Sequence, residues 1–105
     1  MTSIKNNKDI KMTITKRVTF IAKEGCENKM KELLTAMVEP SKAEPGVIFY
    51  DIFQCTENKR KFYAVESWEE EALANHAKTE HYAIYKSSYE QYCEEKYTEH
   101  LEILG

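Results

Sequence analysis

Two β-prone segments joined by a short polar turn constrain the fold of this chain most. Residues 47–55 and 60–68 are rich in β-branched and aromatic residues, and residues 56–59 (TENK) between them are typical of a hairpin connection. Apolar residues occupy both odd and even positions of the two segments. A sheet that helices cover on one face only alternates apolar and polar residues. The pattern therefore predicts a sheet that is covered on both faces.

The segment before this hairpin predicts a strand and then a helix. β-prone residues run from Met12 to Lys23, with an apolar set on one face, and Gly25 closes this expected strand. Apolar residues then recur at helical spacing from Met30 to Val38, which predicts an amphipathic helix. Pro40 lacks a backbone N–H and is expected to kink or end that helix.

After the hairpin the pattern predicts a helix in two pieces and a last strand. Ser67 is expected to cap the first piece, together with Glu70, and this piece runs to about Ala77. Thr79 is expected to cap the second, from Glu80 to about Glu94. The alternation from Tyr97 to Leu104 predicts the last strand.

The order of these elements is β-α-β-β-α-β with a split second helix, which predicts a ferredoxin-like α+β fold with a four-stranded antiparallel sheet. We expect one domain over residues 12–105, after an N-terminal tail of residues 1–11. No segment is left over to cover the second face of the sheet. We therefore expect a homodimer packed sheet to sheet.

Composition excludes several classes of protein. The net charge is −3 and the basic residues form no stripe, so nucleic acid is not an expected partner. No apolar stretch approaches the roughly 20 residues that cross a bilayer, and the N-terminus lacks the apolar core of a secretory signal, so a membrane is not expected either. Three widely spaced cysteines form no CxxC pair, and the three histidines lack ligand spacing. We expect a cytoplasmic protein with no disulfide, no metal and no cofactor.

Glu66 and His76 are the residues to which we assign chemistry. Glu66 shares a strand face with Phe62 and Trp68, and it is either a structural ion-pair partner or a carboxylate that orients a histidine or a substrate hydroxyl. His76 lies on the apolar side of its helix, either as a satisfied core residue or as a proton acceptor near neutral pH. His81, in the first turn of the next helix, is more simply structural or exposed.

Aromatic side chains supply a candidate binding surface. Four tyrosines recur on one face of the last helix, at positions 82, 85, 89 and 92. Such a stripe is either core or one wall of an aromatic cavity for a flat, hydroxylated ligand, because each buried phenol needs a hydrogen-bond partner. The candidate ligand-binding set comprises Trp68, Tyr50, Phe62, His81, Tyr82 and Tyr85.

The combination of motifs resembles the antibiotic biosynthesis monooxygenase family. It comprises Gly25, the run EPSKAEPG at 39–46, Tyr50, Glu66-Ser-Trp68, and His76-x-x-Thr79-x-His81-Tyr82, and the resemblance covers residues 12–104. It implies a dimeric α+β barrel with a pocket between sheet and helices. Members include oxygenases that act on quinols and polyphenols without metal or flavin. Other relatives degrade heme, isomerise small metabolites or have no known activity.

Two positions depart from the heme-degrading branch of the family. Its members carry an asparagine in the middle of the first strand, where this chain has Val18, and a heme-ligating histidine where this chain aligns about Ser87. Both departures argue against heme degradation.

The resemblance and the residues together predict a cofactor-independent monooxygenase that acts on a small aromatic, a quinol or polyphenol, with O₂. His76 would remove a phenolic proton with the help of Glu66, and the aromatic residues would hold the ring. Two alternatives stay open on the same fold: a non-catalytic small-molecule-binding or stress-response module, and an isomerase of a small metabolite that uses the same two residues as proton shuttles.

Overall fold

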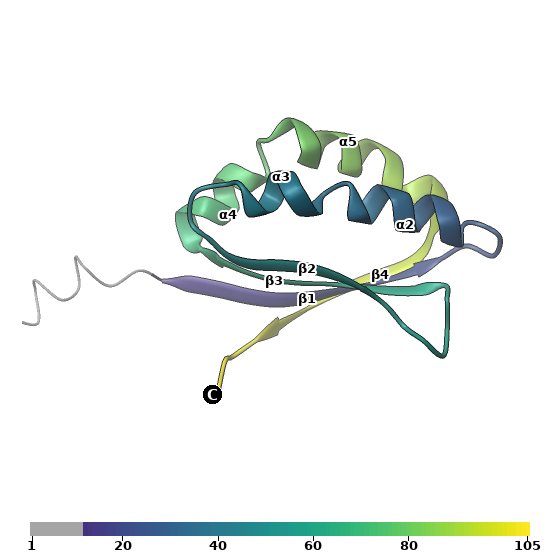
Figure 1. The fold of residues 1–105 in the computed structure, drawn as a ribbon, viewed down its shortest axis with the longest axis horizontal. Coiled ribbons are helices and arrows are strands. Elements are labelled where there is room, and N and C mark those ends of the chain that lie inside the picture. Colours follow the sequence, from purple (N-terminus) through teal and green to yellow (C-terminus); the bar gives the residue numbers. More distant parts are fainter. Residues whose placement is uncertain (1–11) are drawn as a thin grey trace, which may run out of the picture.

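The computed structural model describes residues 12–105, so the expected N-terminal tail lies outside the described residues. The elements follow the predicted order: β1 (Thr13–Ala22), α2 (Glu27–Thr35), α3 (Val38–Lys42), β2 (Val47–Gln54), β3 (Lys61–Glu69), α4 (Glu70–His76), α5 (Glu80–Ser88), the 3₁₀ turn η1 (Tyr89–Tyr92) and β4 (Cys93–Leu101). Figure 1 shows these helices together above one face of the sheet.

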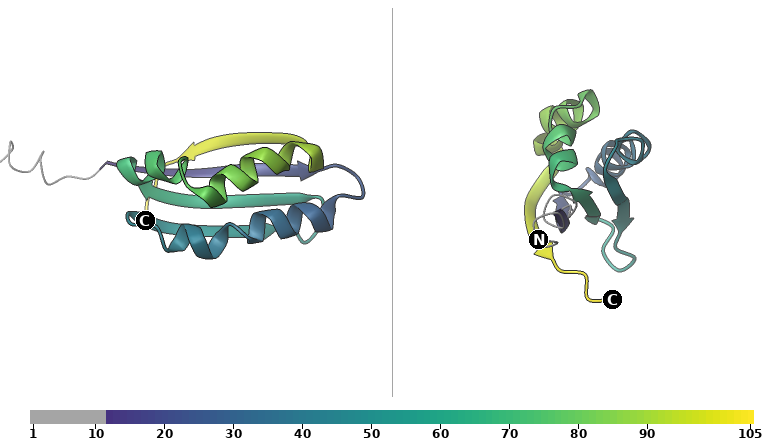
Figure 2. Two further views of the ribbon diagram at one scale, coloured as in Figure 1. Left: turned by 90° about the horizontal axis from the view of Figure 1, so that it is seen from above. Right: turned by 90° about the vertical axis from the view of Figure 1, so that its left-hand side faces the viewer.

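The sheet has the strand order β2-β3-β1-β4, and each neighbouring pair is antiparallel. This arrangement confirms the predicted ferredoxin-like α+β fold. Seen from above, the α2–α3 segment runs along β2 and the α4–α5 segment runs along the opposite side of the sheet (Figure 2). The two helical segments therefore form two walls above the sheet.

The core lies between the sheet and these helices. Phe20 of β1 and Phe62 of β3 are almost fully buried and are register partners, and Met30 and Leu34 of α2 cover that side of the sheet. Each large apolar side chain that is buried in this way stabilises the fold by about 1.5–3 kcal/mol. Among residues 12–105, no helix is both long enough and apolar enough to cross a bilayer.

Three local predictions differ from the structure. The helix break lies at residues 36–37, before Pro40, which occupies the first turn of α3, where backbone N–H groups need no intrahelical partner. Ser67 does not cap α4: it stays in β3, fully buried, with its hydroxyl 2.7 Å from that of Thr15. The last strand begins at Cys93 rather than Tyr97, because an edge strand tolerates the polar residues 94–96 that break the alternation.

The predicted cap of α5 is confirmed, since the Thr79 hydroxyl accepts a hydrogen bond from the backbone N–H of Tyr82. This cap separates α4 from α5. It thereby fixes the direction in which His81 and Tyr82 leave the turn.

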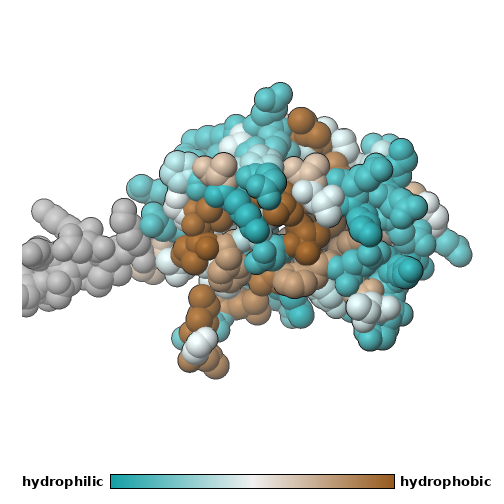
Figure 3. Space-filling view, in the orientation of Figure 1, coloured by the Kyte–Doolittle hydropathy of each residue, from teal (hydrophilic) through white to brown (hydrophobic). Residues whose placement is uncertain are grey.

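The face of the sheet opposite the helices carries no covering element within residues 12–105. One row across it joins Phe53, Tyr63, Thr19 and Tyr97 as register partners. Phe53 is 52% and Tyr97 42% exposed. The apolar C-terminal residues Ile103 and Leu104 are also exposed, and Figure 3 shows brown atoms of the C-terminal segment projecting below the sheet.

Candidate functional site

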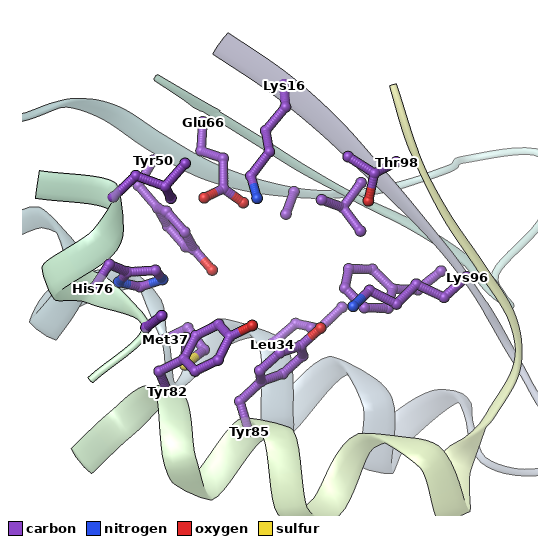
Figure 4. Close-up of a pocket in the computed structure, with 15 residues that line it drawn as sticks. Lys16, Leu34, Met37, Tyr50, Glu66, His76, Tyr82, Tyr85, Lys96 and Thr98 are labelled. Atoms are coloured by element: carbon purple, nitrogen blue, oxygen red, sulfur yellow. The ribbon is translucent and has the colours of Figure 1, made fainter. Parts of the chain in front are cut away.

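A cavity of about 180 Å³ lies between the sheet and the two helical walls. Five of the predicted site residues line it, from four different elements: Tyr50 (β2), Glu66 (β3), His76 (α4), Tyr82 and Tyr85 (α5). Figure 4 shows Tyr50, His76 and Tyr82 at one end of this space and Lys96 at the other. The structure thus brings together the two residues that were expected to carry chemistry.

Three other predicted residues lie behind the cavity wall. Phe62 is a core residue, 1% exposed. Trp68 is fully buried and packs against the ring of His76, with ring centroids 4.3 Å apart. His81 lies beside His76, with centroids 5.6 Å apart, and does not line the cavity. Trp68 therefore supports the histidine instead of stacking on a ligand.

Glu44 is the carboxylate that holds His76. Its Oε2 lies 2.6 Å from Nδ1 of His76 and also 2.6 Å from Nε2 of His81. The side chains of Glu44 and His76 are only 11% and 4% exposed. These are short hydrogen bonds that are shielded from water, which strengthens them.

Glu66 was expected to help His76, but the carboxylate that is hydrogen-bonded to His76 is that of Glu44. Glu66 Oε1 accepts a hydrogen bond of 2.7 Å from the indole N–H of Trp68, and its carboxylate faces the cavity. The reason is geometric. Alternate residues of one strand share a face, so the side chains of Glu66 and Trp68 are neighbours on β3 and bond to each other. Glu66 is thus available to a ligand, whereas Glu44 orients the histidine.

The tautomer of His76 follows from its partner. A carboxylate oxygen only accepts hydrogen bonds, so Nδ1 of His76 carries the proton that is shared with Glu44. A neutral ring then keeps its lone pair on Nε2, which makes no hydrogen bond within residues 12–105. The arrangement therefore offers a proton acceptor to a ligand in the cavity.

The turn before β2 brings Glu44 to this position. Gly46 has a φ of +87°, and a Cβ placed there would lie 2.6 Å from the Cβ of Ala72. The turn therefore packs directly against α4, where only glycine fits. Glu44 belongs to the run EPSKAEPG at 39–46, and it was not among the site residues that the sequence predicted. The signal that could have revealed it is a glutamate immediately before a turn that leads into the strand of Tyr50.

Glu44, His76 and His81 also form the one cluster of three potential metal ligands found in residues 12–105, with ligand atoms within 4.8 Å of one another. The expectation that the histidines lack ligand spacing is wrong for these two. Ligand atoms around one tetrahedral zinc ion lie roughly 3.3 Å apart, given bonds of about 2.0–2.1 Å. The observed separations of 2.6 Å are instead hydrogen-bond lengths. We therefore assign a hydrogen-bonded His–Glu–His cluster.

Burial keeps the cavity tyrosines protonated. It raises the pKa of Tyr50 well above the ordinary value, and the negative charge of Glu66 raises it further. Burial also raises the pKa of Tyr85, with a smaller contribution from Tyr82. Both phenols thus keep their O–H groups at neutral pH and can donate hydrogen bonds to an oxygen atom of a ligand.

Comparison with known proteins places this geometry in a family. Residues 13–86 match the family described as antibiotic biosynthesis monooxygenase. The solved structure of PA3566 from Pseudomonas aeruginosa is 30% identical, with a TM-score of 0.83 over 89% of this chain and 95% of that one. No curated protein matches the chain.

Two further structures extend the likeness. A protein of unknown function from Bacteroides thetaiotaomicron, described as a possible oxidoreductase, is 28% identical, with a TM-score of 0.80 over 90% of this chain and 100% of that one. A protein described as an antibiotic biosynthesis monooxygenase is 20% identical, with a TM-score of 0.78 over 90% of this chain and 100% of that one. Together with the match over residues 13–86, these comparisons show that the chain belongs to the antibiotic biosynthesis monooxygenase family.

Proposed function

We propose that this protein is a monooxygenase that inserts one atom of O₂ into a small phenol or quinol without a resident cofactor. The observation that carries the proposal is the orientation of His76, which lines the cavity while Glu44 holds its Nδ1. A general base must lie where the substrate's proton will be, and its environment must leave a lone pair free. His76 supports the proposal because it lines the cavity and its bond to Glu44 leaves Nε2 free to take a proton.

The reaction balances without an added reductant. Nε2 of His76 takes a phenolic proton, and the resulting electron-rich anion transfers an electron to O₂. The two radicals combine into a ring hydroperoxide, whose O–O bond then breaks with loss of water. For a hydroquinone the products are a hydroxyquinone and one water molecule. The substrate supplies all four electrons.

The other cavity residues have supporting roles in this proposal. Glu66 accepts a hydrogen bond from a second substrate hydroxyl, because its carboxylate faces the cavity and already holds the indole N–H of Trp68. Tyr50 and Tyr82 donate hydrogen bonds to substrate oxygen near His76, and Tyr85 forms part of the floor under the ring. The surrounding wall excludes water from the radical pair.

Oxygen uptake with a panel of single-ring quinols tests the proposal. We expect His76→Ala to lower kcat by about 10²–10⁴-fold, the usual contribution of a general base. His100→Ala is the matched control, since His100 is exposed on β4 and does not line the cavity. Unchanged turnover in His76→Ala contradicts the proposal. Product formation without O₂ would instead favour an isomerase, and saturable binding without any turnover would favour a binding module.

We also propose that two copies pair through the uncovered face of the sheet. The row of Phe53, Tyr63 and Tyr97 is apolar, and Leu101 on the same face is 43% exposed. Isologous pairing of such a face is the commonest way to bury it. Light scattering should give twice the chain mass of 12.3 kDa. Phe53→Asp should give a monomer, whereas Ile84→Asp, which changes an exposed residue of α5, should not.

A cytoplasmic location is part of the same proposal. Cys26, Cys55 and Cys93 are all free thiols. Free thiols are typical of proteins that work in a reducing compartment.

A further inference from the structure

Lys96 of β4 brings a positive charge to the end of the cavity opposite His76 (Figure 4). No ion pair to Lys96 is found within residues 12–105. Its Nζ lies over three aromatic rings, 4.7 Å from the centroid of Tyr89, 5.6 Å from that of Tyr85 and 5.9 Å from that of Phe20. The rings hold the ammonium in place at the cavity but do not neutralise it.

The surroundings of Lys96 disfavour an isolated charge. Burial lowers the pKa of Lys96, and the positive charges of Lys16 and Lys86 lower it further. An anion beside Nζ would offset all three effects, because an opposite charge favours the ammonium form. The negative charge of Glu66 raises the pKa of Lys96, but by less than burial or either lysine lowers it, so an anion beside Nζ would still be favoured.

One carboxylate, that of Glu66, lines the cavity. Glu66 and Lys16 are register partners across β3 and β1, and Figure 4 shows the amine of Lys16 directed toward the Glu66 carboxylate. The cavity therefore contains two ammonium groups and one carboxylate. Lys96 is the ammonium that lies at the far end of the cavity from this carboxylate (Figure 4).

A ligand that binds in the cavity changes the hydration of Lys96, so the affinity depends on the charge of the ligand. Lys96 is an exposed residue of β4, and a neutral ligand that fills the cavity removes the water on the cavity side of its ammonium without replacing it, which weakens binding. A carboxylate in the same place forms a charge-assisted hydrogen bond that replaces the lost water.

The cavity also limits the size of the ligand. An apolar cavity of about 150 Å³ holds one benzene ring, so a cavity of about 180 Å³ accommodates one ring with small substituents. We propose that the ligand is a single-ring phenol or quinol that carries an anionic substituent, with its hydroxyl at His76 and its anionic group at Nζ of Lys96. The orientation of the hydroxyl rests on the proposed function, whereas the preference for an anion does not.

Calorimetric titration under nitrogen with two matched probes tests this inference. 4-Hydroxybenzoate and 4-hydroxybenzamide have nearly the same shape and differ in charge. We expect the unaltered protein to bind the acid about tenfold or more tightly than the amide, the range of a charge-assisted contact. Equal affinity for the two probes, or binding of neither, overturns the inference.

Variants at position 96 show whether Lys96 causes the preference. Lys96→Gln should bring the two affinities to within about twofold by weakening only the acid, and Lys96→Arg should restore the preference. Lys31→Gln is the control, because it removes the same charge from an exposed residue of α2 that does not line the cavity, and it should leave the preference in place. A preference that persists in Lys96→Gln overturns the inference.

The binding assay is independent of turnover. If the acid binds through Lys96 and no quinol of the panel is oxidised, this inference stands and the oxygenase is removed. Oxidation of neutral quinols together with equal binding of the two probes removes this inference alone.

Discussion

Replacing Gly46 by alanine tests whether the turn that carries Glu44 is held against α4. Gly46 and Gly25 have nearly the same backbone conformation, with φ of +87° and +84°. The cost of an L-residue in this region, about 1–2 kcal/mol, is therefore common to both substitutions. The surroundings differ: a Cβ at Gly46 would lie 2.6 Å from the Cβ of Ala72, whereas at Gly25 nothing lies within 4 Å.

The difference between the two variants measures the packing of the turn. Carbon atoms in contact lie about 3.5–4.0 Å apart, so the turn or α4 must shift by about 1 Å, and such overpacking costs roughly 1–3 kcal/mol. Gly46→Ala should thus lower the free energy of unfolding by about 2–5 kcal/mol and Gly25→Ala by about 1–2 kcal/mol.

Denaturant unfolding followed by the fluorescence of Trp68, with the slope compared between variants, gives both values. Gly46→Ala should also lower kcat, because the shift moves Glu44 away from His76. Equal destabilisation of the two variants would refute the claim that the turn packs directly on α4.

Three further predictions concern the site. Glu44→Gln should lower kcat by roughly 10–100-fold, as is common when the partner that orients a functional histidine is changed. His81→Ala should lower kcat less, because the bond between Glu44 and His76 remains. Steady-state oxygen uptake compares the two variants, and an unchanged kcat in Glu44→Gln would contradict the role of Glu44. Trp68→Phe should lower the free energy of unfolding by about 1–3 kcal/mol, because Glu66 loses a buried hydrogen bond. Denaturant titration measures this change. An unchanged free energy of unfolding would mean that water replaces the indole as the hydrogen-bond donor to Glu66. Dialysis against a chelator should leave kcat unchanged, because in the proposed reaction His76 forms the substrate anion and this anion reduces O₂ directly. Loss of activity that zinc or iron restores would contradict this.

The order of the elements could be predicted from the sequence because each depends on a local pattern. The hairpin at 47–68 and the cap at Thr79 both follow from nearby residues, and the structure confirms them. Where a local pattern competes with a tertiary contact, prediction fails. Ser67 has the spacing of a helix cap, but its hydroxyl pairs with Thr15 across the sheet.

The site was predictable in part for the same reason. Tyr50, Glu66 and His76 could be selected by residue type and strand or helix face, and all three line the cavity. Glu44 could not, because its contact with His76 spans 32 positions of the chain and depends on the close approach of the turn at Gly46 to α4. Lys96 was missed because its strand was expected to begin at Tyr97.

The fate of the two atoms of O₂ tests the central claim most directly. With ¹⁸O₂ and a single-ring quinol, mass spectrometry should find one ¹⁸O atom in each product molecule and the other in water, and His76→Ala should abolish this labelling while His100→Ala preserves it. Product that carries no ¹⁸O, or labelling that survives in His76→Ala, would contradict the account.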